Sequence, residues 1–240
     1  MRPISKGLNS AVAVVLDTDN GPVFLKGLPV DHPRRWTQDM EAVINPYVRH
    51  LGPRLLWRVR DEWDILGFEY IKGRHADPTP GSADLPKVVE TISHVGEIPC
   101  PSLPLKEATS RWRNYVDDSL DLALLDGDRL LHTDYNPLNI LMAEGRALLV
   151  DWAWPTRGAG WIDPACLVLR IMSYGHTAEQ AEAVVADLSA WRQADPRGLQ
   201  VFAEANARFW AGAAADNPAD WPVRMAAAAQ SWHAYRLNQD

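Results

Sequence analysis

The sequence predicts an α+β fold of two lobes, with a small strand-rich N-terminal lobe and a larger helical C-terminal lobe. Three observations along the 240 residues predict it. The first third alternates β-type runs with turn residues, a segment rich in Gly, Pro, Ser and Asp covers 73–86, and helical periodicity dominates after Asp163. We therefore expect a first lobe over 1–72, a linker over 73–86 and a second lobe over 87–240.

The first lobe begins with a predicted hairpin. Asn20 and Gly21 stand between the apolar runs 11–16 and 22–26, which is typical of a tight turn between two strands. A second hairpin is expected to pair 54–59 with 65–70.

A helix is expected between these hairpins, over 35–48. Its apolar positions recur at helical spacing, and Glu41 lies among them. The face expected to be buried holds Met40, Val43, Ile44 and Tyr47.

The second lobe is predicted to be helical apart from short strands at 130–131, 139–142 and 147–150. Thr177 and Gln180 form a capping box at the start of one helix. That helix is expected to continue through Val184, Val185, Leu188 and Trp191, and two further helices are expected over 199–214 and 222–237.

Composition excludes several classes of protein. Apolar residues make up 47% and charged residues 23% of the chain, and no apolar run is long enough to span a membrane. The net charge of −7 argues against a nucleic-acid or anionic-membrane partner and permits a cationic small molecule. Only two cysteines occur, Cys100 and Cys166, which fits a reducing cytoplasm better than a disulfide framework.

The segment that carries chemistry begins at His132. It reads His-x-Asp, with Asp134, and Asn139 follows five residues after the aspartate. A strand then ends in Asp151, and the expected hairpin brings this residue alongside Asn139. One carboxylate at an acceptor hydroxyl and two oxygen ligands suit a phosphoryl transfer that uses Mg²⁺. Upstream, Lys26 ends a strand and Glu41 lies on the next helix, a pair that holds nucleotide phosphates in kinases.

This constellation resembles the aminoglycoside phosphotransferase family, the antibiotic-kinase branch of the protein-kinase-like fold. The resemblance extends from about residue 7 to the C-terminal helices. It implies a protein-kinase-like fold with a reduced first strand, and ATP or GTP and Mg²⁺ as cofactors. The resemblance implies that Asp134 is the catalytic base and that Asn139 and Asp151 are Mg²⁺ ligands. It implies that Lys26 contacts the nucleotide phosphates, that Glu41 orients Lys26, and that the backbone of Glu69 to Ile71 contacts the adenine. His132 is then a structural residue of the catalytic loop, and Asp163 is the buried aspartate that holds this loop in place.

The chain departs from the family pattern at two places. Thr133 stands between His132 and Asp134, where the family commonly has Gly. The Gly-rich phosphate loop is reduced to 6–10, with Ser10 as its candidate contact.

Acceptor residues are less clearly marked. By the resemblance, acidic residues of the C-terminal helices neutralise the amines of an aminoglycoside, and the candidates are Asp216, Asp220 and Asp240. Trp154 and Trp161 are candidates for stacking on a sugar, although core packing is the commoner role of tryptophan.

The resulting hypothesis is an ATP- and Mg²⁺-dependent O-phosphotransferase acting on a hydroxyl of a small polar acceptor, with an aminoglycoside antibiotic as one acceptor class. A kinase of another metabolite and a non-catalytic kinase-like binding protein remain open. A metallohydrolase built on His132 and Asp134 is a third class, but the other histidines show no metal-ligand spacing.

Overall fold

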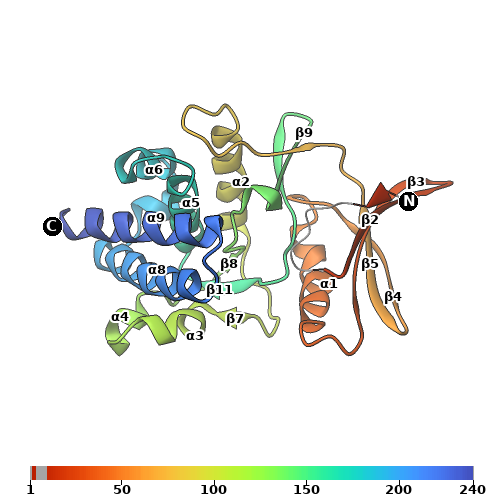
Figure 1. Ribbon diagram of the computed structural model, residues 1–240, viewed down its shortest axis with the longest axis horizontal. Coiled ribbons are helices and arrows are strands. Elements are labelled where there is room, and N and C mark those ends of the chain that lie inside the picture. Colours follow the sequence, from red (N-terminus) through yellow and green to blue (C-terminus); the bar gives the residue numbers. More distant parts are fainter. Residues whose placement is uncertain (1, 4–9, 240) are drawn as a thin grey trace. The chain divides into compact units, whose positions relative to one another are not determined.

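The computed structural model describes residues 2–3 and 10–239. The reduced phosphate loop, except for Ser10, and Asp240 therefore lie outside the described residues. The chain divides into two compact units, shown in Figure 1. Within the described part, the first unit comprises the chain up to Ala76 together with Pro137–Pro155, and the second comprises Asp77–Asn136 and the chain from Thr156 onward. The predicted division assigned 137–155 to the helical lobe, whereas these residues pack within the first unit.

The first unit contains an antiparallel five-stranded sheet in the order β1-β2-β3-β5-β4. Its strands are β1 (Arg2–Pro3), β2 (Val12–Thr18), β3 (Gly21–Pro29), β4 (Leu55–Arg60) and β5 (Trp63–Glu69). Both predicted hairpins are present, as β2–β3 and β4–β5. In the first, Thr18 pairs with Gly21, so the two-residue turn is Asp19 and Asn20. Gly21 has a φ of 103°, a conformation that glycine adopts without steric cost.

Helix α1 (Trp36–Val48) packs on β4 and β5 (Figure 1). The predicted buried face was wrong in part: Ile44 is buried, but Val43 and Tyr47 are exposed. The buried positions are instead Thr37, Gln38, Glu41, Ile44 and Val48. Glu41 is accommodated on this face because it has a cationic partner on the sheet, as described below.

A second, three-stranded sheet completes the first unit, in the order β10-β9-β6. Its strands are β6 (Arg74–His75), β9 (Ile140–Ala143) and β10 (Arg146–Leu149), and the 3-10 helix η2 (Pro137–Asn139) leads into β9. Glu144 and Gly145 form the turn of the β9–β10 hairpin, both with positive φ. The amide of Leu149 donates to the carbonyl oxygen of Leu51, so this hairpin is bonded to the segment after α1.

The second unit contains a three-stranded sheet in the order β7-β11-β8. The strands are β7 (Lys106–Glu107), β8 (Arg129–Leu131) and β11 (Thr156–Gly158). Thr156 pairs with Leu131 on one side and with Lys106 on the other. The sequence patterns indicated only β8, because β7 and β11 are too short to show a period.

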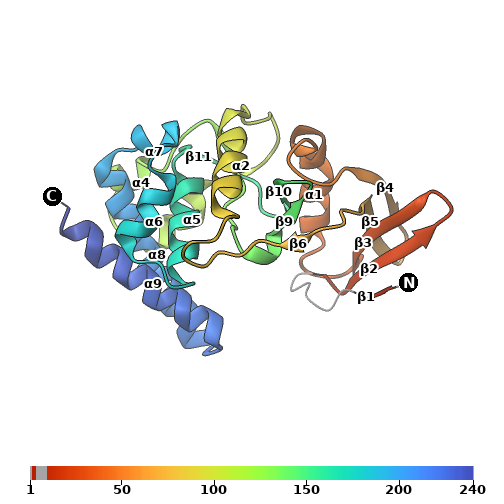
Figure 2. The same ribbon diagram turned by 90° about the horizontal axis from the view of Figure 1, so that it is seen from above.

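Helices make up most of the second unit (Figures 1 and 2). They are α2 (Leu85–Glu97), α3 (Ala108–Trp112), α4 (Ser119–Ala123), α5 (Ile162–Met172), α6 (Ala178–Val185), α7 (Ser189–Arg192), α8 (Pro196–Asp216) and α9 (Asp220–Leu237), with the 3-10 helix η1 (Arg113–Tyr115) after α3. Helices α8 and α9 lie side by side (Figure 2). All residues of α5 except Cys166 are buried.

The predicted capping box is confirmed: Thr177 accepts from the amide of Gln180, whose side chain accepts from the Thr177 amide. The predicted continuation of this helix to Trp191 was wrong. Leu188 is extended, with ψ of 130°, and separates α6 from α7. The side chain of Leu188 is buried. Within the described residues, no helix combines the length and the apolar character needed to cross a bilayer.

Candidate active site

Three charged side chains meet in the first unit. Lys26 on β3 lies with its Nζ 2.6 Å from Glu41 Oε2 and 2.8 Å from Asp151 Oδ1. The lysine and glutamate side chains are only 11% and 7% exposed. A lysine buried to this degree requires anionic partners, because an unpaired charge is costly to remove from water.

Lys26 and Glu41 shift each other's pKa, and Asp151 adds a second carboxylate beside them. Burial alone would lower the pKa of Lys26, but the charges of Glu41 and Asp151 outweigh it and raise the pKa above its ordinary value. Burial raises the pKa of Glu41 above its ordinary value, and the Lys26 charge opposes this only in part. Lys26 therefore stays protonated at neutral pH.

The β9–β10 hairpin brings Asn139 next to the segment that carries Asp151. Leu149 pairs with Ile140, and the amide of Val150 donates to the carbonyl oxygen of Asn139 at 2.9 Å. Asp151 follows directly, with a φ of 63°. This left-handed turn ends the strand, and the Asp151 carboxylate lies beside Lys26.

Asn139 and Asp151 supply one amide oxygen and one carboxylate. This donor set fits Mg²⁺, which is commonly held by one or two carboxylates together with phosphate oxygens and water. Among the described residues, no three His, Cys, Asp or Glu side chains group as ligands of a protein-enclosed metal. The metallohydrolase alternative on His132 and Asp134 therefore finds no ligand set in the part of the chain that is described.

The candidate adenine segment follows the end of β5. The amide of Glu69 donates to the carbonyl oxygen of Arg54, and its carboxylate pairs with the Arg54 guanidinium at 3.3 Å. Ile71 lies between β5 and β6 and is half-buried. Ser10 precedes β2, and the next residue, Ala11, donates to the carbonyl oxygen of Gly27, directly after Lys26.

The candidate catalytic loop begins in the second unit, where Asp163 holds its first residues. Oδ2 of Asp163 accepts from the amide of His132 at 2.9 Å, and its Oδ1 accepts from the amide of Thr133 at 2.8 Å. Asp163 is 2% exposed. Burial raises its pKa, and the two amide donors oppose that rise. The carboxylate thus satisfies two backbone donors that follow the end of β8.

Asp134 is the exposed end of this loop. Its amide donates to Nδ1 of the buried His132 at 3.3 Å, and its side chain is 48% exposed. Arg170 on α5 lies with its Nη2 3.4 Å from Asp134 Oδ1. The carboxylate is therefore both oriented and accessible to a small molecule.

Sequence reasoning missed two arginines beside this loop, Arg170 and Arg111. Arg170 is 9% exposed within α5, and Arg111 lies on the five-residue helix α3. Neither position belongs to a motif, and a single arginine on a helix is usually a surface residue. No signal in the sequence marks either one.

The acceptor candidates are spread over both units. Asp216 ends α8 and Asp220 begins α9, and both are exposed at the turn between these helices. Trp154 belongs to the first unit, where its ring packs edge-on against Trp36 with centroids 4.5 Å apart. Trp161 is buried against Phe202, as core packing requires.

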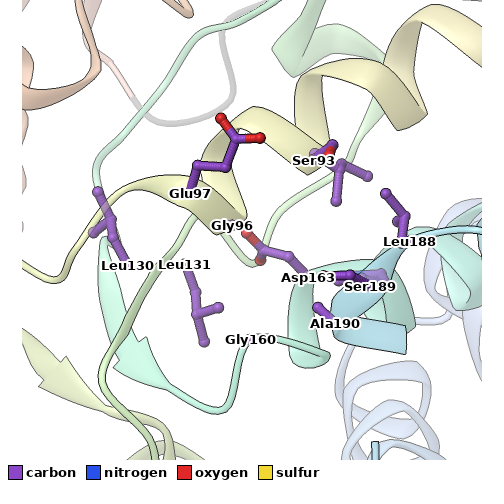
Figure 3. Close-up of a pocket in the computed structure, with 12 residues that line it drawn as sticks. Ser93, Gly96, Glu97, Leu130, Leu131, Gly160, Asp163, Leu188, Ser189 and Ala190 are labelled. Atoms are coloured by element: carbon purple, nitrogen blue, oxygen red, sulfur yellow. The ribbon is translucent and has the colours of Figure 1, made fainter. Parts of the chain in front are cut away.

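A small cavity lies beside Asp163 (Figure 3). Leu130, Leu131 and Asp163 form part of its wall, and α2 contributes Ser93, Gly96 and Glu97. Its volume is about 100 Å³. Nucleotide-sized ligands occupy pockets of about 300–1,000 Å³, so this cavity is too small for ATP.

No protein-family model and no curated sequence matches this chain. Solved structures do match. An aminoglycoside phosphotransferase from Alicyclobacillus acidocaldarius has a TM-score of 0.66 over 100% of this chain and 92% of its own, at 14% identity. The choline kinase LicA from Streptococcus pneumoniae has a TM-score of 0.65 over 98% and 92%, at 13% identity. The chain has the fold of these kinases.

The aminoglycoside 2′-phosphotransferase-IIIa, solved as its GDP complex, matches in the same way, with a TM-score of 0.61 over 98% of this chain and 92% of its own at 10% identity. These matches confirm the predicted two-lobed, protein-kinase-like fold class. At such identities they establish the kinase fold alone, so the roles of individual residues rest on the geometry above.

Proposed function

We propose that this chain is a small-molecule kinase that transfers the γ-phosphoryl group of ATP or GTP to a hydroxyl group. The observation that carries the proposal is the buried Lys26–Glu41 pair with Asp151 bonded to the same amine. In kinases a lysine held by a glutamate contacts the nucleotide phosphates, and a nearby aspartate holds Mg²⁺.

Asp134 is the proposed catalytic base. Its half-exposed carboxylate accepts the proton of the acceptor hydroxyl as that oxygen attacks the γ-phosphorus, and the bond to the β-phosphate oxygen breaks to release the nucleoside diphosphate. His132 and Asp163 hold the loop in place through the hydrogen bonds already described.

Lys26 and the pair Asn139 and Asp151 are the proposed phosphate end of the site. Lys26 remains charged and provides a fixed cation for the phosphates, and Glu41 orients it. Asn139 and Asp151 would hold Mg²⁺, which neutralises charge on the phosphates when it is bound. The backbone from Glu69 to Ile71 is the proposed adenine contact, and Ser10 is a further proposed phosphate contact.

The proposed acceptor is a small polar molecule that carries a hydroxyl group. The net charge of −7 and the exposed Asp216 and Asp220 favour a cationic acceptor, with aminoglycosides as the first class to test. A kinase of a non-antibiotic metabolite or a non-catalytic ligand-binding protein would show a different outcome in the same experiment.

The test begins with calorimetric binding of ATP and GTP to the wild type and to Asp151→Ala, with and without Mg²⁺. We expect Mg²⁺-dependent binding to the wild type that is lost in Asp151→Ala. The control is Asp61→Ala, an exposed residue in the β4–β5 turn, which should bind as the wild type does. Phosphoryl transfer is then measured by mass change over a panel of aminoglycosides, amino alcohols and sugars.

Binding of nucleotide with transfer to one acceptor class would support the kinase proposal. Mg²⁺-dependent binding without transfer to any member of the panel would favour the non-catalytic alternative. Absence of nucleotide binding to the wild type would contradict the proposal altogether.

A further inference from the structure

Thr133 has a backbone conformation that a threonine rarely adopts. Its φ is 65°, in the left-handed region, where a β-branched side chain collides with its own backbone. The residue stands between the structural His132 and the proposed base Asp134. A conformation of this kind persists only where surrounding contacts hold it.

Two contacts hold Thr133 from opposite ends of the residue. Its amide donates to Asp163 Oδ1 at 2.8 Å, and its hydroxyl Oγ1 accepts from Nη1 of Arg111 at 2.5 Å. The backbone contact would exist for any residue at this position. The side-chain contact exists only because the residue carries a hydroxyl.

Arg111 is itself fixed at the end of the three-stranded sheet. Its Nη1 also donates to Oγ1 of Thr156 at 2.6 Å, and Thr156 is completely buried in β11. Thr156 pairs with Leu131, two residues before Thr133, and with Lys106 on β7, from which the chain runs into α3. One guanidinium therefore joins the start of β11 to the loop that follows β8.

The charge of Arg111 is also close to the loop carboxylates. Burial lowers the pKa of Arg111, and the negative charges of Asp134 and Asp163 oppose this shift. An arginine that is removed from water at this place needs partners of fixed geometry, and the two threonine hydroxyls supply them.

We propose that Arg111 is a positioning residue that holds Thr133 in its left-handed conformation and so sets the direction of Asp134. The role rests on the proposed kinase function. Because Arg111 acts through Thr133, the effect of an Arg111 substitution should depend on which residue stands at position 133. Glycine adopts a φ of 65° without strain, so a chain with glycine at this position should no longer need Arg111.

The experiment compares Arg111→Met, Thr133→Val, Thr133→Gly and the double variant Arg111→Met/Thr133→Gly. Thr133→Val keeps the branched side chain and removes the acceptor of the hydrogen bond. The control is Arg113→Met, an exposed arginine two residues further on in η1. The first readout is hydrogen exchange of the amides in 130–136, which needs no activity.

We expect Arg111→Met and Thr133→Val each to speed this exchange about tenfold, because local opening exposes the amides held by Asp163. In the Thr133→Gly background, Arg111→Met should change it by less than about twofold. Unchanged exchange in Arg111→Met, or an equal effect in both backgrounds, would overturn the proposal.

The second readout is steady-state kinetics with the acceptor that the mass-change assay identifies. Arg111→Met should lower kcat about 10²-fold with the nucleotide KM unchanged, because a small misdirection of the base slows the chemical step. Adding Thr133→Gly should restore kcat to within about threefold of the single Thr133→Gly variant. A wild-type kcat in Arg111→Met would overturn the role.

The two readouts separate this proposal from the proposed function. If the wild type transfers no phosphoryl group to any acceptor, the kinase proposal fails, and hydrogen exchange still decides whether Arg111 holds Thr133. If transfer occurs but exchange shows no coupling, the kinase proposal stands and the Arg111 proposal falls.

Discussion

The Nζ atom of Lys26 lies 2.8 Å from Oδ1 of Asp151, although 125 residues separate them in the chain. One residue belongs to the large sheet of the first unit, and the other follows the last strand of its second sheet. Glu41 on α1 completes the cluster. Two sheets and a helix are therefore joined through a single amine, and the stability of the unit and its proposed chemistry depend on the same atom.

Lys26→Met should destabilise the protein by about 3–5 kcal/mol, the cost of leaving buried carboxylates without their cation. The free energy of unfolding in urea measures this. Adding Glu41→Gln should recover part of the loss, because the variant then buries one charge fewer. Lys87→Met, whose lysine is paired with Glu90 on the surface of α2, should change stability by less than about 1 kcal/mol. Equal losses in the two lysine variants would contradict the assigned burial cost.

The ionisation of Asp64 should account for part of the fall in the free energy of unfolding at acid pH. It is completely buried and pairs with Arg35, Arg58 and Arg60. Burial alone would raise its pKa, but the hydrogen bond and charge of Arg58 lower it below the ordinary value of 3.8. The Asp64 carboxylate therefore binds a proton more readily in the unfolded chain than in the folded one. Ionised Asp64 contributes to the free energy of unfolding above pH 3.8, and this contribution is lost as the pH falls below that value.

Asp64→Asn should accordingly cost about 2–3 kcal/mol at pH 6, because it replaces the buried charged acceptor of three partly exposed arginines with a neutral amide. The difference from wild type should shrink as the pH falls from 4 toward 2, measured by urea unfolding at each pH. Asp61→Asn, an exposed neighbour in the same hairpin, should follow the wild-type curve. A difference that stays constant with pH would show that Asp64 does not titrate as stated.

Asp134→Asn should lower kcat of the proposed reaction by about 10²–10⁴-fold, the usual contribution of a general base. Nucleotide affinity should stay near the wild-type value, because Lys26 and Asp151 are unchanged. Asp187→Asn, at a fully exposed position, should leave both quantities unchanged. Wild-type turnover in Asp134→Asn would remove this residue from the chemistry.

Gly52→Ala should destabilise the first unit, since a Cβ at this position would collide with the backbone carbonyl oxygen of Leu149. A cost of about 1–3 kcal/mol is expected from overpacking against backbone that cannot easily move. Mg²⁺-dependent nucleotide affinity should fall as well, because Leu149 lies two residues before Asp151. Gly96→Ala, whose new Cβ would meet open space on α2, should be neutral or slightly stabilising.

Much of the fold was predictable from local patterns. The β2–β3 and β4–β5 hairpins follow from apolar runs separated by turn residues, and the α6 capping box follows from Thr177 and Gln180. The β9–β10 hairpin was predictable for the same reason, so the sequence indicated that Asn139 lies beside the segment of Asp151. Local propensity is enough for such features because the residues that interact are close in the chain.

Other features depend on tertiary partners that no local pattern shows. The buried face of α1 includes Gln38 and Glu41, whereas apolar periodicity favoured Val43 and Tyr47. Glu41 is buried because Lys26 compensates its charge, and that partner lies on another element. Arg111 is a similar case, since its acceptors, Thr133 and Thr156, are 22 and 45 residues away. The sequence showed that Thr133 is unusual, but not that its backbone is left-handed.

The path of the chain has a consequence for biosynthesis. The chain leaves the first unit after Ala76, builds part of the second, and returns to the first for Pro137–Pro155. A ribosome that has released only the N-terminal segment has therefore made Lys26 and Glu41 but not Asp151. The first unit acquires its final segment only when about two thirds of the protein has emerged, so its completion must wait for synthesis of Pro137–Pro155. Recombination that exchanged this unit between relatives would need to transfer two separate stretches of gene together.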